Sequence, residues 1–163
     1  MLSIVALLLS GGAHAQEHRT VDFDFEEPPE GLGVGIVLGD PSGLSVAYRA
    51  GEHHAVQVDF GYNFNKDRVH ISADYLYNLV ILDTPDMSGV RFPVYIGVGG
   101  RYQNYGNDLA DEDAGFGIRV PIGMAVLPRT LAIDPFLELV PVMLITPETR
   151  ATLEGGIGCR LYF

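Results

Sequence analysis

A single cysteine, Cys159, occurs in the 163 residues, so no disulfide can form within the chain. Beyond the first residues there is no run of about 18 apolar residues, which excludes a transmembrane helix. Basic residues are also scarce: 10 Lys and Arg stand against 21 Asp and Glu, and the net charge is −11. Since no basic stripe is available to meet phosphates, we expect no nucleic acid among the partners of the protein.

The first 30 residues differ in composition from the rest of the chain. A short apolar stretch is followed by the cleavage pattern Ala13-His14-Ala15, which predicts an export signal peptide over residues 1–15. Residues 16–30 are acidic and rich in Glu and Pro near their end, a composition typical of a flexible segment. Apolar and acidic residues alternate within Val21-Asp22-Phe23-Asp24-Phe25, so a short strand is the alternative there.

From residue 31 onward, apolar and polar residues alternate, and no segment has the period of a helix. Turn-forming residues divide this region into eight predicted strands, with loops at 80–89 and 104–113. Alternatively, Val80-Ile81-Leu82 extends the fourth strand. An even number of short strands predicts an antiparallel up-and-down barrel without edges. The predicted strands are 31–39, 44–50, 55–65, 68–79, 90–103, 114–127, 131–145 and 150–163.

The two faces of these strands differ in charge. One face carries no charged residue, whereas the other carries five arginines and five carboxylates. An apolar exterior predicts lipid around the barrel, and eight strands leave room only for side chains inside. The fold expected is therefore an all-β, eight-stranded transmembrane barrel with a polar, side-chain-filled lumen and no open pore. The predicted lumen salt-bridge network comprises Arg49, Asp59, Asp74, Arg91, Arg101, Arg119, Asp134, Glu138, Glu154 and Arg160.

A soluble, lipocalin-like barrel that binds a hydrophobic ligand is the alternative to this interpretation. It requires the opposite arrangement, with the charged residues outside and an apolar cavity inside. The direction of Arg91, Arg119, Glu138 and Glu154 therefore distinguishes the two barrels.

Aromatic residues of the apolar face gather near the ends of the predicted strands. If both chain ends are periplasmic, these residues form two girdles, as expected at the two membrane interfaces. The outer girdle is Tyr62, Phe64, Tyr102 and Phe116, and the inner one is Tyr48, Tyr75, Tyr77, Phe92 and Phe163.

The chain ends in Phe163, with Ile157, Cys159 and Leu161 at every second position before it. This pattern resembles the insertion signal of bacterial outer-membrane barrels. Further stretches resemble a group of small, uncharacterised outer-membrane β-barrel proteins of Gram-negative bacteria; they are 33–35, 39–45, 73–76, 119–123 and 136–141.

The resemblance implies a location in the outer membrane, surrounded by lipid and lipopolysaccharide. It also implies contact with the barrel-assembly machinery during insertion. It implies no enzymatic activity, and we expect a monomer without a cofactor, with a structural or surface-interaction role.

One pattern, at residues 70–74, has the residue types of a catalytic site. His70 and Ser72 lie two residues apart, followed by Asp74, and outer-membrane lipid A deacylases resemble this arrangement. The predicted strand phase points all three residues into the lumen, where no acyl chain would reach. A polar lumen network is therefore the predicted role, and a deacylase-like enzyme is the remote alternative.

Two groups of residues carry side chains of the types that bind metal ions. Adjacent residues of an extended segment point in opposite directions, so His53 and His54 are not expected to share an ion. The acidic residues Asp108, Asp111, Glu112 and Asp113 lack the spacing of a calcium loop and are predicted to be solvated. No metal site is therefore expected.

Overall fold

Antiparallel β-strands make up all the regular secondary structure in the described residues of the computed structural model, which are 30–63, 68–83, 89–105 and 114–163. Within these ranges, no helix is long and apolar enough to cross a membrane. Several sequence predictions lie outside the described residues: the signal peptide, the acidic segment up to residue 29, Phe64 and the acidic loop that contains Asp108 and Asp113.

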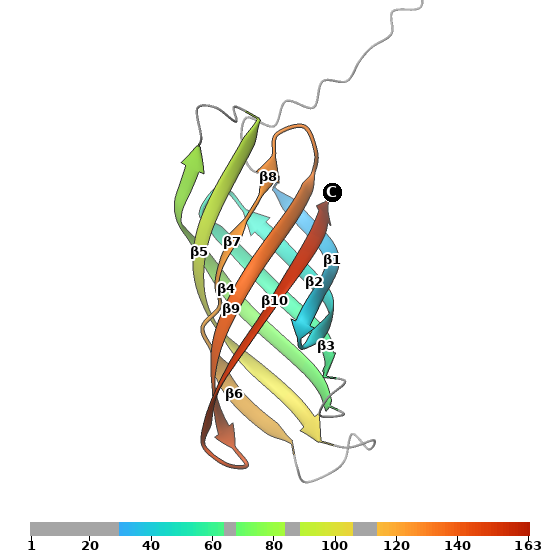
Figure 1. Ribbon diagram of the computed structural model, residues 1–163, viewed down its shortest axis with the longest axis vertical. Helices are drawn as coiled ribbons and strands as arrows, with labels where there is room; N and C mark the ends of the chain where they lie inside the picture. The colour runs from blue at the N-terminus through green and yellow to red at the C-terminus, as the bar shows by residue number, and fades with distance from the viewer. Residues whose placement is uncertain (1–29, 64–67, 84–88, 106–113) are drawn as a thin grey trace, which may run out of the picture.

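The strands follow one another around a closed ring (Figure 1). Strands β6, β7 and β8 share one position between β5 and β9, and β10 pairs with both β9 and β1. The predicted all-β antiparallel fold with eight strand positions is thus confirmed. The strands are β1 (Gly31–Asp40), β2 (Ser42–Ala50), β3 (His54–Asn63), β4 (Arg68–Asp83), β5 (Val90–Tyr105), β6 (Gly115–Arg119), β7 (Ile122–Ala125), β8 (Leu127–Pro128), β9 (Ile133–Thr146) and β10 (Arg150–Tyr162).

The ring has two distinct ends. The terminal end carries the start of β1, the C-terminus and the turn between β2 and β3 at Gly51–His53. The far end carries the tight turn around Pro41 and the turn between β9 and β10. Figure 1 shows the terminal end at the top, where the C-terminus is marked.

The predicted continuous sixth strand, 114–127, is wrong, because it is interrupted at Val120–Pro121 and again at Val126. Each interruption lies opposite a proline of β9: the Val120 N–H donates to Pro141 O at 3.0 Å, and the Val126 N–H donates to Pro135 O at 2.8 Å. The N and C=O of one strand residue point to the same neighbour, and proline has no N–H to donate. The ladder therefore lacks one bond at each break.

The predicted loop over 80–89 is also wrong in its first part, because β4 continues to Asp83, and the alternative extension of the fourth strand over 80–82 is confirmed. The alternation breaks at Leu79–Val80, and the pairing register between β4 and β5 shifts between Asn78 and Val80. This irregularity is a β-bulge, which places two successive residues on the outer side. Strand β5 likewise extends to Tyr105, and β2 begins at Ser42 rather than at residue 44.

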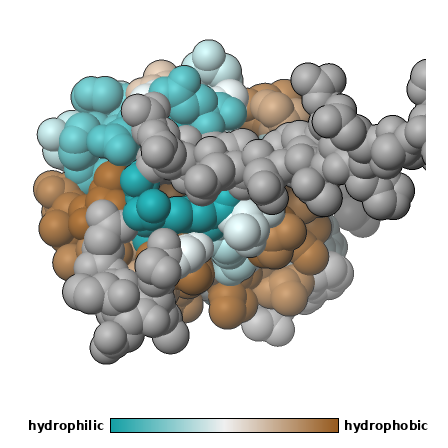
Figure 2. Space-filling view, turned by 90° about the horizontal axis from the view of Figure 1, so that it is seen from above, coloured by the Kyte–Doolittle hydropathy of each residue, from teal (hydrophilic) through white to brown (hydrophobic). Residues whose placement is uncertain are grey.

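Large apolar side chains cover the outside of the ring, whereas polar ones fill its interior. Along β4, for example, Ile71, Tyr75 and Tyr77 are exposed, while Ser72 and Asp74 are buried. Figure 2, a view onto the terminal end, shows hydrophobic residues around much of the rim and hydrophilic residues towards the middle. The cluster of buried hydrophobic residues is small and consists of Leu76, Tyr95, Ala125 and Phe136.

Candidate functional site

Charged side chains converge in the interior of the ring. Of the ten charged residues that the sequence assigned to the inward face, Arg91 alone is only partly buried, and the other nine are between 1% and 8% exposed. Arg91 lies at the terminal mouth, where its guanidinium is 3.6 Å from the carboxylate of Glu52. The buried nine are Arg49, Asp59, Asp74, Arg101, Arg119, Asp134, Glu138, Glu154 and Arg160.

Asp134 is the centre of the cluster nearest the terminal end. Its Oδ2 lies 3.2 Å from Nη2 of Arg49 and 3.3 Å from Nη1 of Arg160. The hydroxyl of Tyr162 donates to the same oxygen at 3.4 Å, and the Arg49 guanidinium lies 4.9 Å from the centre of the Tyr162 ring. One buried carboxylate therefore forms ion pairs with two guanidinium groups and accepts a hydrogen bond from a phenol.

Arg160 links this cluster to the middle of the interior. Its Nε donates to Ser45 Oγ at 3.0 Å, its Nη2 donates to the Gln57 side-chain oxygen, and its guanidinium lies 3.8 Å from the centre of the Phe136 ring. The ring packs against Gly158, where an added Cβ would lie 2.3 Å from it. The absence of a side chain at residue 158 thus makes room for the aromatic support of Arg160.

Two carboxylates occupy the middle of the interior. Asp59 accepts hydrogen bonds from Ser45 Oγ at 2.6 Å and from Gln57 Nε2 at 2.8 Å. Glu138 accepts one from the hydroxyl of Tyr95 at 2.8 Å and a longer one from Gln57 Nε2 at 3.4 Å. Neutral donors therefore share the stabilisation of these two negative charges with the arginines.

Arg119 organises the part of the interior closer to the far end. Its Nε lies 3.4 Å from Asp74 Oδ1, and its Nη1 lies 3.8 Å from Asp59 Oδ2. The same Nη1 donates to Ser72 Oγ and is 3.5 Å from His70 Nε2. In a separate pair, Arg101 binds the carboxylate of Glu154 and also the side-chain oxygen of Gln103. The interior thus holds ion pairs that are linked through Arg119 and Arg160, together with the separate Arg101–Glu154 pair.

The three residues considered for catalysis belong to this network. His70, Ser72 and Asp74 are at most 2% exposed, and all three face inward. Ser72 Oγ donates to Asp59 Oδ2 at 3.4 Å and accepts from Arg119, so its bonds are to the network. The deacylase-like alternative requires His70 and Ser72 on the outer face, and this arrangement does not meet that requirement.

The two histidines considered as a metal pair have separate partners. His53 Nδ1 lies 3.1 Å from the backbone oxygen of Asn78, while His54 Nδ1 lies 2.5 Å from the hydroxyl of Tyr75. Within the part of the chain that the structure describes, no group of three or more His, Cys, Asp or Glu side chains could hold a metal ion.

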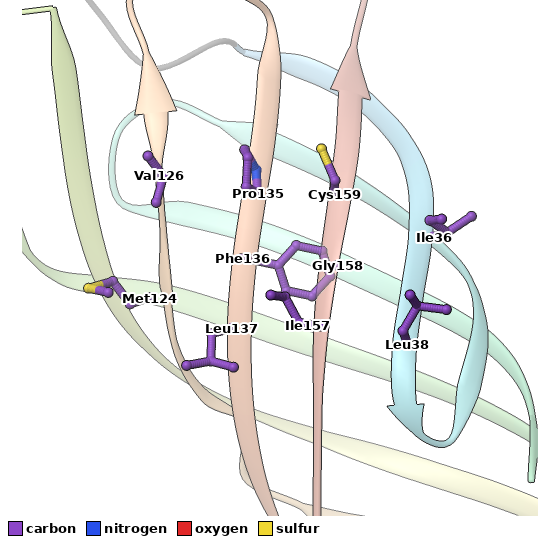
Figure 3. Close-up of a pocket in the computed structure, with 10 residues that line it drawn as sticks. All are labelled: Ile36, Leu38, Met124, Val126, Pro135, Phe136, Leu137, Ile157, Gly158 and Cys159. Atoms are coloured by element: carbon purple, nitrogen blue, oxygen red, sulfur yellow. The ribbon is translucent and has the colours of Figure 1, made fainter.

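Two cavities lie in different places. An interior space of about 20 Å³, lined by Asp59, Arg119, Glu138 and Glu154 among others, is roughly large enough for one water molecule. A depression of about 450 Å³ lies on the outer surface across β1, β7, β9 and β10. Its lining is almost entirely apolar, and Figure 3 shows side chains such as Leu38, Leu137 and Ile157 around it.

The aromatic residues predicted to form girdles lie at both ends of the outer surface. Tyr48, Tyr75 and Tyr77 are exposed on strand residues near the terminal end, as is Phe163, while Phe92 is half-buried. Tyr62, Tyr102 and Phe116 are exposed towards the far end. The residues of the predicted assembly signal, Ile157, Cys159, Leu161 and Phe163, are also exposed on the outside. Their roles at a membrane and in assembly stay predictions.

Sequence reasoning assigned the charges but missed their neutral partners. Gln57 shares an inward face with Asp59, and Tyr95 shares one with Arg91 and Arg101, so the strand phase could have identified both. Tyr162 is likewise inward because it alternates with the apolar residues of the C-terminal pattern. The alternation of side chains along a strand could not predict which group Gln57, Tyr95 or Tyr162 binds.

We expect Tyr95→Phe to lower the free energy of unfolding by about 1.5–3 kcal/mol, because it removes a buried hydrogen bond to the charged Glu138. Tyr102→Phe, the same change on the exposed outer surface, is the control and should change the free energy by less than about 0.5 kcal/mol. Denaturant unfolding followed by far-ultraviolet circular dichroism measures both. Equal effects of the two substitutions would show that the Tyr95–Glu138 contact contributes nothing.

Comparison of the chain with protein-family models, with curated proteins and with solved structures found no match. The interior network and the apolar exterior therefore carry the functional interpretation by themselves.

Proposed function

We propose that this protein is a non-enzymatic β-barrel of the bacterial outer membrane, with a structural or surface-interaction role and no open pore. The observation that carries the proposal is the apolar surface around the ring. Exposed large hydrophobic side chains come from β1 to β7, β9 and β10, and include Leu38 at 59%, Leu139 at 52% and Ile157 at 60%. Contiguous exposed apolar area of this extent is rare on soluble monomers.

The dimensions of the strands support the proposal. A tilted strand needs about 9–11 residues to cross the hydrocarbon region. The shortest continuous strand position, β2, has 9 residues, while β4 and β5 have 16 each. The ring also pairs every strand position on both sides, which hydrocarbon surroundings require because no water is present to bind free backbone groups.

The interior supports a closed barrel. Nine buried charged residues and their neutral partners occupy it, and the interior space found there holds about 20 Å³. Passage of a solute would require breaking several ion pairs at once. The predicted export signal, the C-terminal alternation and the family resemblance support the outer-membrane location, with lipid, lipopolysaccharide and the assembly machinery as partners.

The second candidate function is a soluble barrel that binds a hydrophobic ligand. The burial of charged side chains in the interior argues against it. It needs an apolar interior, whereas Arg119, Glu138 and Glu154 are at most 7% exposed and line the interior. It also needs a polar exterior, and the larger depression on the outside is apolar.

Cell fractionation combined with heat-modifiable gel mobility tests the proposal. We expect the protein in the outer-membrane fraction, with an unheated form that migrates differently from the heated one because the folded barrel resists detergent. Recovery of the protein in the soluble periplasm would overturn the outer-membrane assignment. A membrane-bound protein that conducts ions steadily in planar bilayers would overturn the closed interior alone.

A further inference from the structure

Strand β4 continues past the ring at the terminal end. Its last residue paired with β3 is Tyr77, opposite His54, and the Asn78 N–H donates to His53 O at 2.9 Å. Beyond Asn78, the residues up to Asp83 pair with β5 only. Among the described residues, no strand lies along the other edge of Leu79–Asp83. Figure 1 shows β4 and β5 rising above the ends of β1 and β2.

This open edge is apolar as well as unpaired with another strand. Leu79, Val80 and Leu82 are 59%, 45% and 49% exposed. Edge strands of this kind offer backbone donors and acceptors to any extended segment, and exposed apolar side chains add area to be buried. The edge therefore fits a strand that has apolar residues at every second position.

The described chain begins beside the turn that adjoins this edge. A carboxylate oxygen of Glu30 lies 3.7 Å from the site of a Cβ on Gly51, in the turn between β2 and β3. The same turn holds His53, which binds Asn78 at the point where the open edge starts. Glu30 therefore lies beside the turn that adjoins the open edge of β4.

We propose that the N-terminal segment, residues 20–26, pairs with the open edge of β4 as an additional antiparallel strand. Its sequence is Thr20-Val21-Asp22-Phe23-Asp24-Phe25-Glu26, which has the required alternation. Running towards Glu30, the segment is antiparallel to β4, and it brings Phe25 to Val80 and Phe23 to Leu82. Pro28 and Pro29 cannot donate to a ladder, so the pairing ends before them.

Length and charge agree with this pairing. The residues between Phe25 and Glu30 span up to about 16 Å when extended, and neighbouring strands lie about 4.8 Å apart. With Phe23 and Phe25 on the outer side, Asp22 and Asp24 face the mouth of the interior. Arg91 lies there, opposite Asp83 in the β4–β5 ladder and 3.6 Å from Glu52. A cation thus stands on the side that receives the acidic residues.

Disulfide trapping in the full, folded chain tests the pairing. In a Cys159→Ala background, Leu82→Cys is combined in turn with Val21→Cys, Phe23→Cys or Phe25→Cys. The matched controls combine Leu82→Cys with Asp22→Cys or Asp24→Cys, whose side chains point to the opposite face of the same segment. We expect an intramolecular disulfide in at least one of the three apolar variants, with at least about tenfold more product than in either control.

The other outcomes would overturn the proposal. Equal trapping of apolar and control positions would show a segment that only collides with the edge, and disulfide-linked dimers would show pairing between two copies. A second measurement tests the pairing independently in case the cysteine variants do not oxidise. Amide hydrogen exchange of residues 79–83 should be about tenfold faster in Phe23→Pro than in the unmodified chain, with His18→Pro as the control. Unchanged exchange in Phe23→Pro would also overturn the pairing.

Discussion

Asp134→Ala should lower the free energy of unfolding by about 3–5 kcal/mol, the largest single effect that the interior predicts. Asp134 is 1% exposed and lies 3.2 Å and 3.3 Å from the guanidinium nitrogens of Arg49 and Arg160. Its removal leaves two buried cations without their shared anion and takes away the acceptor of Tyr162.

Urea unfolding of the protein refolded in lipid vesicles measures this effect, with the folded fraction read from gel mobility. The chain contains no tryptophan, so intrinsic Trp fluorescence is not an available probe. Glu148→Ala is the control, since it removes an acidic side chain from an exposed turn and should cost less than about 0.5 kcal/mol. If Asp134→Ala costs no more than Glu148→Ala, the ion-pair cluster does not stabilise the fold.

Leu139→Arg should destabilise the protein in a bilayer by about 2–4 kcal/mol, because it places a cation on the outer surface near the middle of β9. Leu139 is 52% exposed, so the substitution creates no cavity and no steric clash inside the ring. For a protein with water on the outside, the same change would be close to neutral. The cost therefore measures which solvent surrounds the ring.

Leu131→Arg is the matched control for this experiment. Leu131 is 54% exposed in the connection between β8 and β9, at the terminal end, and an arginine there should cost only about 0–1 kcal/mol. Comparing urea unfolding of both variants in lipid vesicles cancels the general effect of an added positive charge. Equal costs at the two positions would contradict a membrane around the middle of the ring.

These two experiments address different parts of the molecule. Substitution of Asp134 tests whether the interior charges hold the ring together, whatever surrounds it. Substitution of Leu139 tests the surroundings and leaves the interior unchanged. A protein sensitive to the first and indifferent to the second would be a charge-filled ring in water, which neither candidate function anticipates.

The sequence by itself determined which way the side chains point. A strand has a period of two, so residues such as Ile71 and Ser72 are assigned to opposite faces as soon as one of them is placed. The number of strand positions followed from the turn residues, and their even count allowed a closed ring, which the pairing of β1 with β10 completes. The inward direction of the nine buried charges is a consequence of the same period.

Only the tertiary structure decided the partners, because pairing across the interior joins residues far apart in the sequence. No local pattern indicates that Arg49 reaches Asp134, or that Tyr95 donates to Glu138. The register shift at Leu79 and the breaks opposite Pro135 and Pro141 likewise could not be assigned from one strand alone, since each depends on the neighbouring strand. Periodicity is a property of one strand, whereas register and ion pairing are properties of several strands together.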